Sequence, residues 1–163
     1  MNNFRKYFIL ILAITAIFSF DDCSGQINST YILIPMDLSQ TDHLKAYGVA
    51  FWALEREIDI DWLLNYLGGS FLISNFEGLE REMRLRGVSY NGIEETTLLS
   101  IKNRIAENNM EIVRLEKAPN IAVYVPPGKQ PWDDAVRMSL EYAEIPHTTL
   151  WDEEVMAGKL EEF

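Results

Sequence analysis

The stretch 120–151 constrains the fold of this chain more than any other part of it. Residues 121–125 (IAVYV) form a short apolar run rich in β-branched side chains, which favours a strand. Residues 126–131 (PPGKQP) interrupt regular structure, because proline lacks a backbone N–H and fixes its own φ. A helix is expected from about residue 132 to residue 143, and a second strand over residues 146–150. This order predicts a βαβ unit, in which a right-handed crossover joins two parallel strands.

Residues 31–117 show a similar alternation of apolar runs and amphipathic segments. Asp42 is placed to cap a helix, Gly87 to end one, and Asn91-Gly92 to form a turn. The expected helices cover residues 43–56, 75–86, 95–108 and 152–156, and the further strands cover 31–34, 58–65, 70–73, 88–90 and 110–115. We therefore predict an α/β fold with a mainly parallel sheet and flanking helices. Its two lobes, residues 26–117 and 118–163, would meet near a linker at 117–120.

The first 25 residues have the pattern of a signal peptide. Arg5 and Lys6 precede residues 8–20, which are apolar apart from two hydroxyl side chains. That run is shorter than the roughly 20 residues of a membrane span but suits a signal sequence. Cleavage after Gly25 would release a periplasmic or envelope protein without a transmembrane segment. Acylation at Cys23 and a retained anchor stay open as alternatives.

The net charge and the cysteine content limit which partners the protein can bind and which reactions its side chains can carry out. The net charge is −11, and signal cleavage would remove two basic and two acidic residues, so the value persists. An acidic surface repels nucleic acid phosphates, which excludes nucleic acid as a partner. Cleavage would also remove the single cysteine, and with it disulfide and thiol chemistry. A small molecule or a protein remains as the expected partner.

A ligand site is expected beside the loop 126–131, because α/β sheets bind ligands outside the carboxyl ends of parallel strands. Lys129 offers a cation there and Trp132 an aromatic wall. Asp37, in the loop after the first strand, completes the predicted ligand-binding set. Asp133 and Asp134 fit helix caps better than ligand contacts, and the spacing around Lys129 is not that of a P-loop.

The sequence offers no catalytic constellation and no metal site. His43 and His147 are far apart, and neither an HExxH nor a GxSxG pattern is present. The acidic run at 151–154 (WDEE) admits two interpretations. Its carboxylates could bind a cation or serve as a general acid and base, or they could cap a short helix. No cofactor follows from these residues.

The chain resembles a family of exported bacterial proteins catalogued as asparagine synthetase B-like. The resemblance rests on residues 31–37 (YILIPMD), 43–48 (HLKAYG), 62–66 (WLLNY), 68–72 (GGSFL), 115–119 (LEKAP) and 131–136 (PWDDAV). It covers nearly all of the chain after the signal segment.

This resemblance implies a fold but no set of catalytic residues. From residue 120 the chain is similar to the opening of a class I glutamine amidotransferase-like domain, which has a flavodoxin-like sheet. Family members continue past Phe163, so the fold is expected to be incomplete at that end. A glutamine-dependent asparagine synthetase needs an N-terminal cysteine and a Ser-Gly-Gly-x-Asp-Ser loop, and this sequence has neither. Small-ligand binding is therefore the leading expectation. Two alternatives are an amide-processing enzyme completed beyond Phe163 and an interaction module of the envelope.

Overall fold

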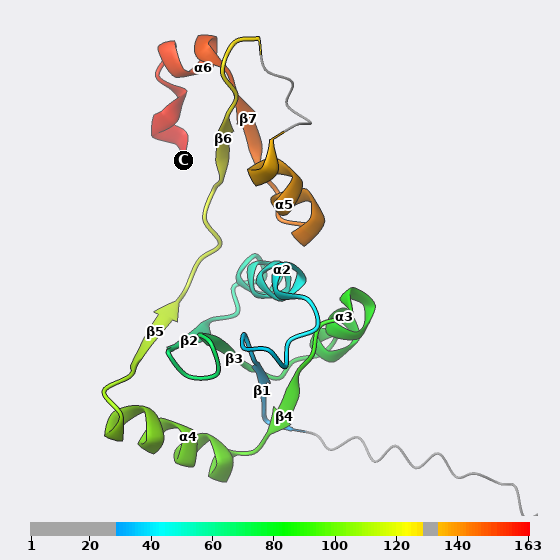
Figure 1. Ribbon diagram of the computed structural model, residues 1–163, viewed down its shortest axis with the longest axis vertical. Coiled ribbons are helices and arrows are strands. Elements are labelled where there is room, and N and C mark those ends of the chain that lie inside the picture. The colour runs from blue at the N-terminus through cyan, green and yellow to red at the C-terminus, as the bar shows by residue number, and fades with distance from the viewer. Residues whose placement is uncertain (1–28, 129–133) are drawn as a thin grey trace, which may run out of the picture.

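The computed structural model describes residues 29–128 and 134–163, which form two lobes (Figure 1). The predicted signal segment with its cleavage site and Cys23 lies outside the described residues. The N-terminal lobe contains β1 (Tyr31–Ile34), α2 (His43–Leu54), β2 (Ile60–Leu64), β3 (Ser70–Ser74), α3 (Leu79–Arg86), β4 (Asn91–Ile93), α4 (Glu95–Glu107) and β5 (Glu111–Leu115). The C-terminal lobe contains β6 (Ala122–Tyr124), α5 (Ala135–Ala143), β7 (Thr148–Leu150), α6 (Asp152–Met156) and the 3₁₀ helix η3 (Lys159–Glu162).

The sheet of the N-terminal lobe is antiparallel, so the prediction of a mainly parallel sheet is wrong for this lobe. Its order is β4-β1-β3-β2-β5, and every neighbouring pair is antiparallel. The pairing makes β1 and β2, which α2 connects, run in the same direction with β3 between them. The strands joined by α3, and those joined by α4, are likewise parallel without being neighbours. The helical crossovers therefore exist as expected, but none joins adjacent strands of this sheet.

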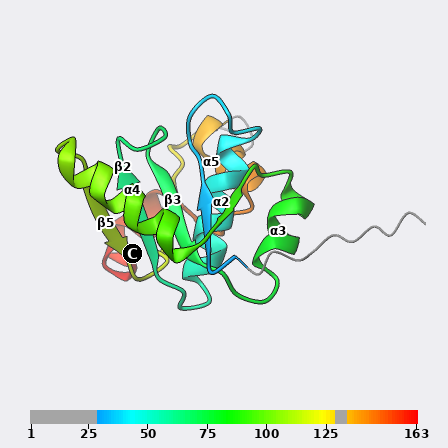
Figure 2. The same cartoon turned by 90° about the horizontal axis from the view of Figure 1, so that it is seen from below.

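Helices cover both faces of this sheet (Figures 1 and 2). Alternation along β1 sends Ile32 and Ile34 to one face and Leu33 to the other. The first face packs against α2 and α3 through fully buried side chains that include Val49 and Met83. The second face packs against Leu98, Ile101 and Ile105 of α4.

The C-terminal lobe contains the predicted βαβ unit. β6 and β7 pair in parallel, with Ala122 opposite Thr148 and Tyr124 opposite Leu150. An extended connection, residues 116–121, links this lobe to β5 (Figure 1). α5 packs on α2 and so brings the C-terminal lobe against the first. In residues 29–128 and 134–163, no helix has the length and apolarity to cross a membrane.

Local capping chemistry accounts for several helix boundaries. The Asp42 carboxylate accepts the Lys45 N–H at 3.0 Å and starts α2 as predicted, and Asp134 caps α5 in the same way. Gly87 ends α3 with φ 69°. α3 begins at residue 79 rather than 75, because Gly78 has φ 93°, a left-handed conformation that interrupts a right-handed helix. The expected turn at Asn91-Gly92 is wrong, since both residues belong to β4.

Candidate functional site

The structure places only one of the three predicted ligand-binding residues. Asp37 lies in the loop between β1 and α2, where its carboxylate accepts the Ser39 N–H at 3.0 Å and the Ser39 hydroxyl at 2.6 Å. These hydrogen bonds hold the pKa of Asp37 below its ordinary value. Lys129 and Trp132 lie outside the described residues. A ligand site that contains all three residues therefore stays a prediction.

The two histidines both have main-chain partners. His43 Nε2 lies 3.2 Å from the Met36 carbonyl oxygen and 3.1 Å from that of Asp37. His147 Nδ1 lies 3.3 Å from the Ile145 carbonyl oxygen. Within residues 29–128 and 134–163, no three His, Cys, Asp or Glu side chains group as metal ligands would. Each histidine ring therefore hydrogen-bonds to main-chain carbonyl groups of its own loop.

A hollow of about 470 Å³ lies at the carboxyl ends of β6 and β7, where sequence reasoning expected a ligand. Its described lining comprises Val125, Pro127 and residues 151–154. Two of its three carboxylates already have local partners. Asp152 accepts the Tyr124 hydroxyl at 2.6 Å, and Glu154 accepts the Trp151 N–H at 3.0 Å at the start of α6. Of the two interpretations of this acidic run, the structure supports helix capping for Glu154.

A second hollow, which we call the interlobe hollow, lies where the two lobes meet. Its volume is about 220 Å³ and its accessible lining is entirely apolar. Four elements of the N-terminal lobe, α2, β2, β3 and β5, contribute to it, and the C-terminal lobe adds one residue next to the end of α5. The lining residues are Tyr47, Ala50, Phe51, Leu54, Trp62, Phe71, Leu115 and Ile145.

Aromatic rings form one side of the interlobe hollow. The Trp62 ring lies 6.3 Å from the Phe71 ring at an interplanar angle of 29°, and Tyr47 meets Phe71 edge-on at 5.6 Å. Trp62 Nε1 donates to the Gly69 carbonyl at 2.9 Å, so the polar end of the indole is satisfied outside the hollow. These contacts hold the rings in place and leave apolar surface for a ligand.

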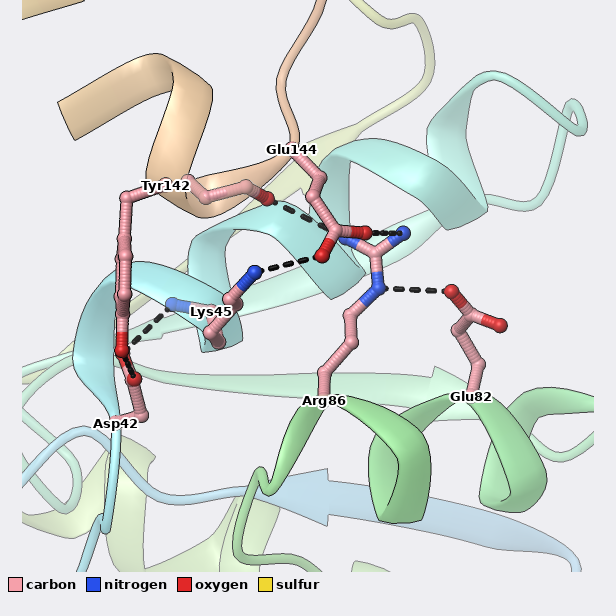
Figure 3. Close-up of polar contacts among 7 residues, drawn as sticks. Asp42, Lys45, Glu82, Arg86, Tyr142 and Glu144 are labelled. Atoms are coloured by element: carbon pink, nitrogen blue, oxygen red, sulfur yellow. Dashed lines mark hydrogen bonds and ion pairs between the residues drawn. The ribbon is translucent and has the colours of Figure 1, made fainter. Parts of the chain in front are cut away.

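A polar cluster joins the end of α5 to α2 and α3 of the N-terminal lobe (Figure 3). Glu144, at the end of α5, lies 2.6 Å from Lys45 Nζ of α2 and 3.2 Å from Arg86 Nη2 of α3. Arg86 Nε also pairs with Glu82 at 2.7 Å, and the Tyr142 hydroxyl donates to Asp42. We call this set the interlobe clasp; it consists of Asp42, Lys45, Glu82, Arg86, Tyr142 and Glu144.

The clasp places two largely buried cations against a half-exposed carboxylate. The Arg86 and Lys45 side chains are only 8% and 16% exposed, whereas Glu144 is 51% exposed. The hydrogen bond from Lys45 lowers the pKa of Glu144, burial opposes this, and the Arg86 charge lowers it further. Burial tends to raise the pKa of Asp42, but the bonds from the Lys45 N–H and Tyr142 bring it below its ordinary value. Both carboxylates are therefore charged at neutral pH.

The backbones of α2 and α5 touch at the same junction. A Cβ atom on Gly48 would lie 1.9 Å from the Ala143 carbonyl oxygen, which also accepts from Arg86 Nη1 at 3.3 Å. Glu144 follows in the left-handed conformation, with φ 59°. Gly48, Ala143 and Glu144 were not predicted from the sequence as site residues. A glycine inside an apolar helical pattern, as Gly48 is, was the one available signal of close packing.

Comparisons of the chain with protein-family models, with curated proteins and with solved structures each found no significant match.

Proposed function

We propose that this chain is a ligand-binding part of an exported protein of the asparagine synthetase B-like family. The observation that carries the binding role is the interlobe hollow, an apolar space at the meeting point of two lobes. Small-molecule sites occur preferentially at such junctions. The resemblance over residues 31–136 supports the family, and residues 5–25 support export to the periplasm or envelope. The parallel β6–α5–β7 unit supports an amidotransferase-like relationship for the C-terminal lobe.

The size and lining of the interlobe hollow suggest the chemistry of its ligand. A volume of about 220 Å³ suits one aromatic ring system or a short branched alkyl group. Burying roughly 150 Å² of apolar surface contributes about 4 kcal/mol. The loss of translational and rotational freedom on binding offsets part of this, so an isolated fragment is expected to bind with a Kd of roughly 1 mM at the tightest. A natural ligand that binds more tightly would need polar groups that reach beyond the hollow.

Indole, an uncharged aromatic fragment, tests this proposal by titration into the 15N-labelled protein. We expect chemical shift changes centred on Ala50, Phe71 and Ile145, with saturation in the millimolar range. Ala50→Leu should abolish them by filling the space, and Ile145→Ala should weaken binding several-fold by removing one wall. Leu99→Ala, on the exposed side of α4, serves as the matched control. Unchanged spectra with the parent protein, or equal binding by Ala50→Leu, would contradict the proposal.

One observation favours the alternative of an amide-processing enzyme with catalytic residues elsewhere. β6 and β7 have three residues each and pair only with one another among the described strands. Parallel sheets normally contain more strands and are covered on both faces. We therefore propose as a second candidate that further strands extend this sheet, from this polypeptide or a partner. Amide hydrolysis by a longer polypeptide, absent from this chain, would favour the enzyme.

A further inference from the structure

The interlobe hollow and the interlobe clasp share one structural element, the end of α5. Ile145 lines the hollow and directly follows Glu144 of the clasp. The Ile145 N–H donates to the Leu140 carbonyl at 2.9 Å, so this residue is tied to the last turn of α5. On the other side, α2 contributes Lys45 to the clasp and Tyr47 to the hollow. A movement of the end of α5 away from α2 would therefore move one wall of the hollow.

The contacts between the two lobes involve a small part of each lobe. They concentrate on α2 and α5, with Arg86 of α3 reaching the end of α5. The covalent link is the extended connection 116–121, which contains no helix or strand. A rotation of the C-terminal lobe about this connection would leave the sheet of the N-terminal lobe intact.

We infer that the interlobe clasp holds one wall of the interlobe hollow in place. With Glu144 on Lys45 and Arg86, Ile145 is held against the N-terminal lobe and completes the hollow. When Glu144 leaves, the C-terminal lobe turns about residues 116–121 and the hollow loses this wall. For its ligand this inference rests on the proposed function, whereas the opening itself concerns the protein alone.

The distribution of partners explains why Glu144 is the residue that releases. Arg86 keeps Glu82 as a partner in both states, and Asp42 keeps the Lys45 N–H, since each of these contacts lies within the N-terminal lobe. Glu144 has both of its cations on the other lobe and is half exposed, so salt and water weaken its attraction to them. Its left-handed backbone, unusual for a glutamate, is a further strain at this position.

The first arm of the test measures opening without a ligand. Fluorescent labels at Leu99→Cys and Met156→Cys, in a Cys23→Ser background, report the distance between the lobes by energy transfer. Both positions are well exposed. Glu144→Gln should raise the open fraction by about fivefold to tenfold, the factor expected for the loss of two partly exposed ion pairs. Glu141→Gln is the matched control, because it removes one charge whose partner, Arg137, lies on α5 itself.

The second arm measures the binding of indole by stopped-flow fluorescence. We expect Glu144→Gln to raise the dissociation rate several-fold and so to weaken binding, because the Ile145 wall is lost in part of the molecules, with Glu141→Gln unchanged. An unaltered distance distribution in Glu144→Gln would overturn the inference, and so would a wider separation of the lobes with an unaltered dissociation rate. If indole binds neither protein, the proposed function fails while the distance measurement still decides whether Glu144 holds the lobes together.

Discussion

At the scale of single residues, the most informative side chain of the N-terminal lobe is Gln40. It is only 6% exposed and ties the loop before α2 to the segment after α3. Its Nε2 donates to the Pro35 carbonyl at 2.8 Å and to that of Ser89 at 3.1 Å, while its Oε1 accepts the Ser89 N–H at 2.8 Å. One amide thus satisfies buried backbone groups from two distant segments. This contact also orients the loop from which α2 starts.

Gln40→Ala is expected to lower the free energy of unfolding by about 2–3 kcal/mol. The variant leaves buried backbone groups without partners, and each such group costs roughly 1–3 kcal/mol. Urea denaturation measures the change. Ser39→Ala is the control. Among the described residues its exposed hydroxyl bonds only to Asp37, so the substitution should lower the free energy of unfolding by less than about 0.5 kcal/mol. Equal midpoints for the two variants would show that the Gln40 contacts do not stabilise the fold.

At the scale of elements, the crossing of α2 and α5 depends on the absence of a side chain. Gly48 sits inside α2, where glycine costs roughly 0.5–1 kcal/mol relative to alanine. The contact with the Ala143 carbonyl explains why the small residue is needed there. The two helices approach closely enough for Arg86 to reach the end of α5 and for Tyr142 to reach Asp42.

The sign of the change in the free energy of unfolding caused by Gly48→Ala distinguishes helix propensity from packing. Helix propensity alone predicts a gain of about 0.5–1 kcal/mol in the free energy of unfolding. The clash with Ala143 predicts the opposite: a less stable protein, with a wider interlobe distance in the energy-transfer measurement. Ser100→Ala, on the exposed face of α4, tests propensity without a clash. A stabilised Gly48→Ala variant with unchanged interlobe distance would show that α5 does not pack on α2 in solution.

At the scale of the whole molecule, the lobes differ in how completely they bury apolar residues. The N-terminal lobe has a sheet covered on both faces. In the C-terminal lobe many large apolar side chains remain exposed, among them Tyr124, Val136, Met138, Met156 and Leu160. The two lobes meet where α5 packs on α2, beside the charged groups of the clasp. These charged groups make the arrangement of the lobes sensitive to pH and salt.

Acid pH is expected to separate the lobes before it unfolds the N-terminal lobe. The pKa values of Glu144 and Asp42 are lowered in the folded state, from ordinary values of 4.5 and 3.8. Their contribution to docking is thus complete above about pH 4.5 and is lost as the pH falls through the lowered values. Energy transfer between the labelled lobes, followed from pH 7 to pH 3, measures this.

Glu144→Gln should show a smaller change over the same pH range, because one titrating group is gone. Glu141→Gln should follow the parent curve. A parent protein whose lobes stay together down to pH 3, or separate only when far-UV circular dichroism is lost, would contradict this expectation.

The sequence predicted the local elements well and their arrangement in part. The N-cap at Asp42 and the helix end at Gly87 were identified correctly, and so was the parallel β6–α5–β7 unit. The mainly parallel sheet was wrong, because a strand–helix–strand pattern specifies the direction of two strands but not whether a third lies between them. β3 takes the central position between β1 and β2 and makes each pair antiparallel.

The sequence by itself determined the start of α2 at Asp42 and the end of α3 at Gly87, since a cap acts on backbone groups only a few residues away. Only the tertiary structure decided the candidate site. Glu144, Lys45 and Arg86 come from three helices, and Ile145 meets Trp62 and Phe71 only because α5 crosses α2 at Gly48. A pattern of neighbouring residues in the sequence does not predict that these side chains come into contact. Contacts between distant segments depend on how all the elements pack at once.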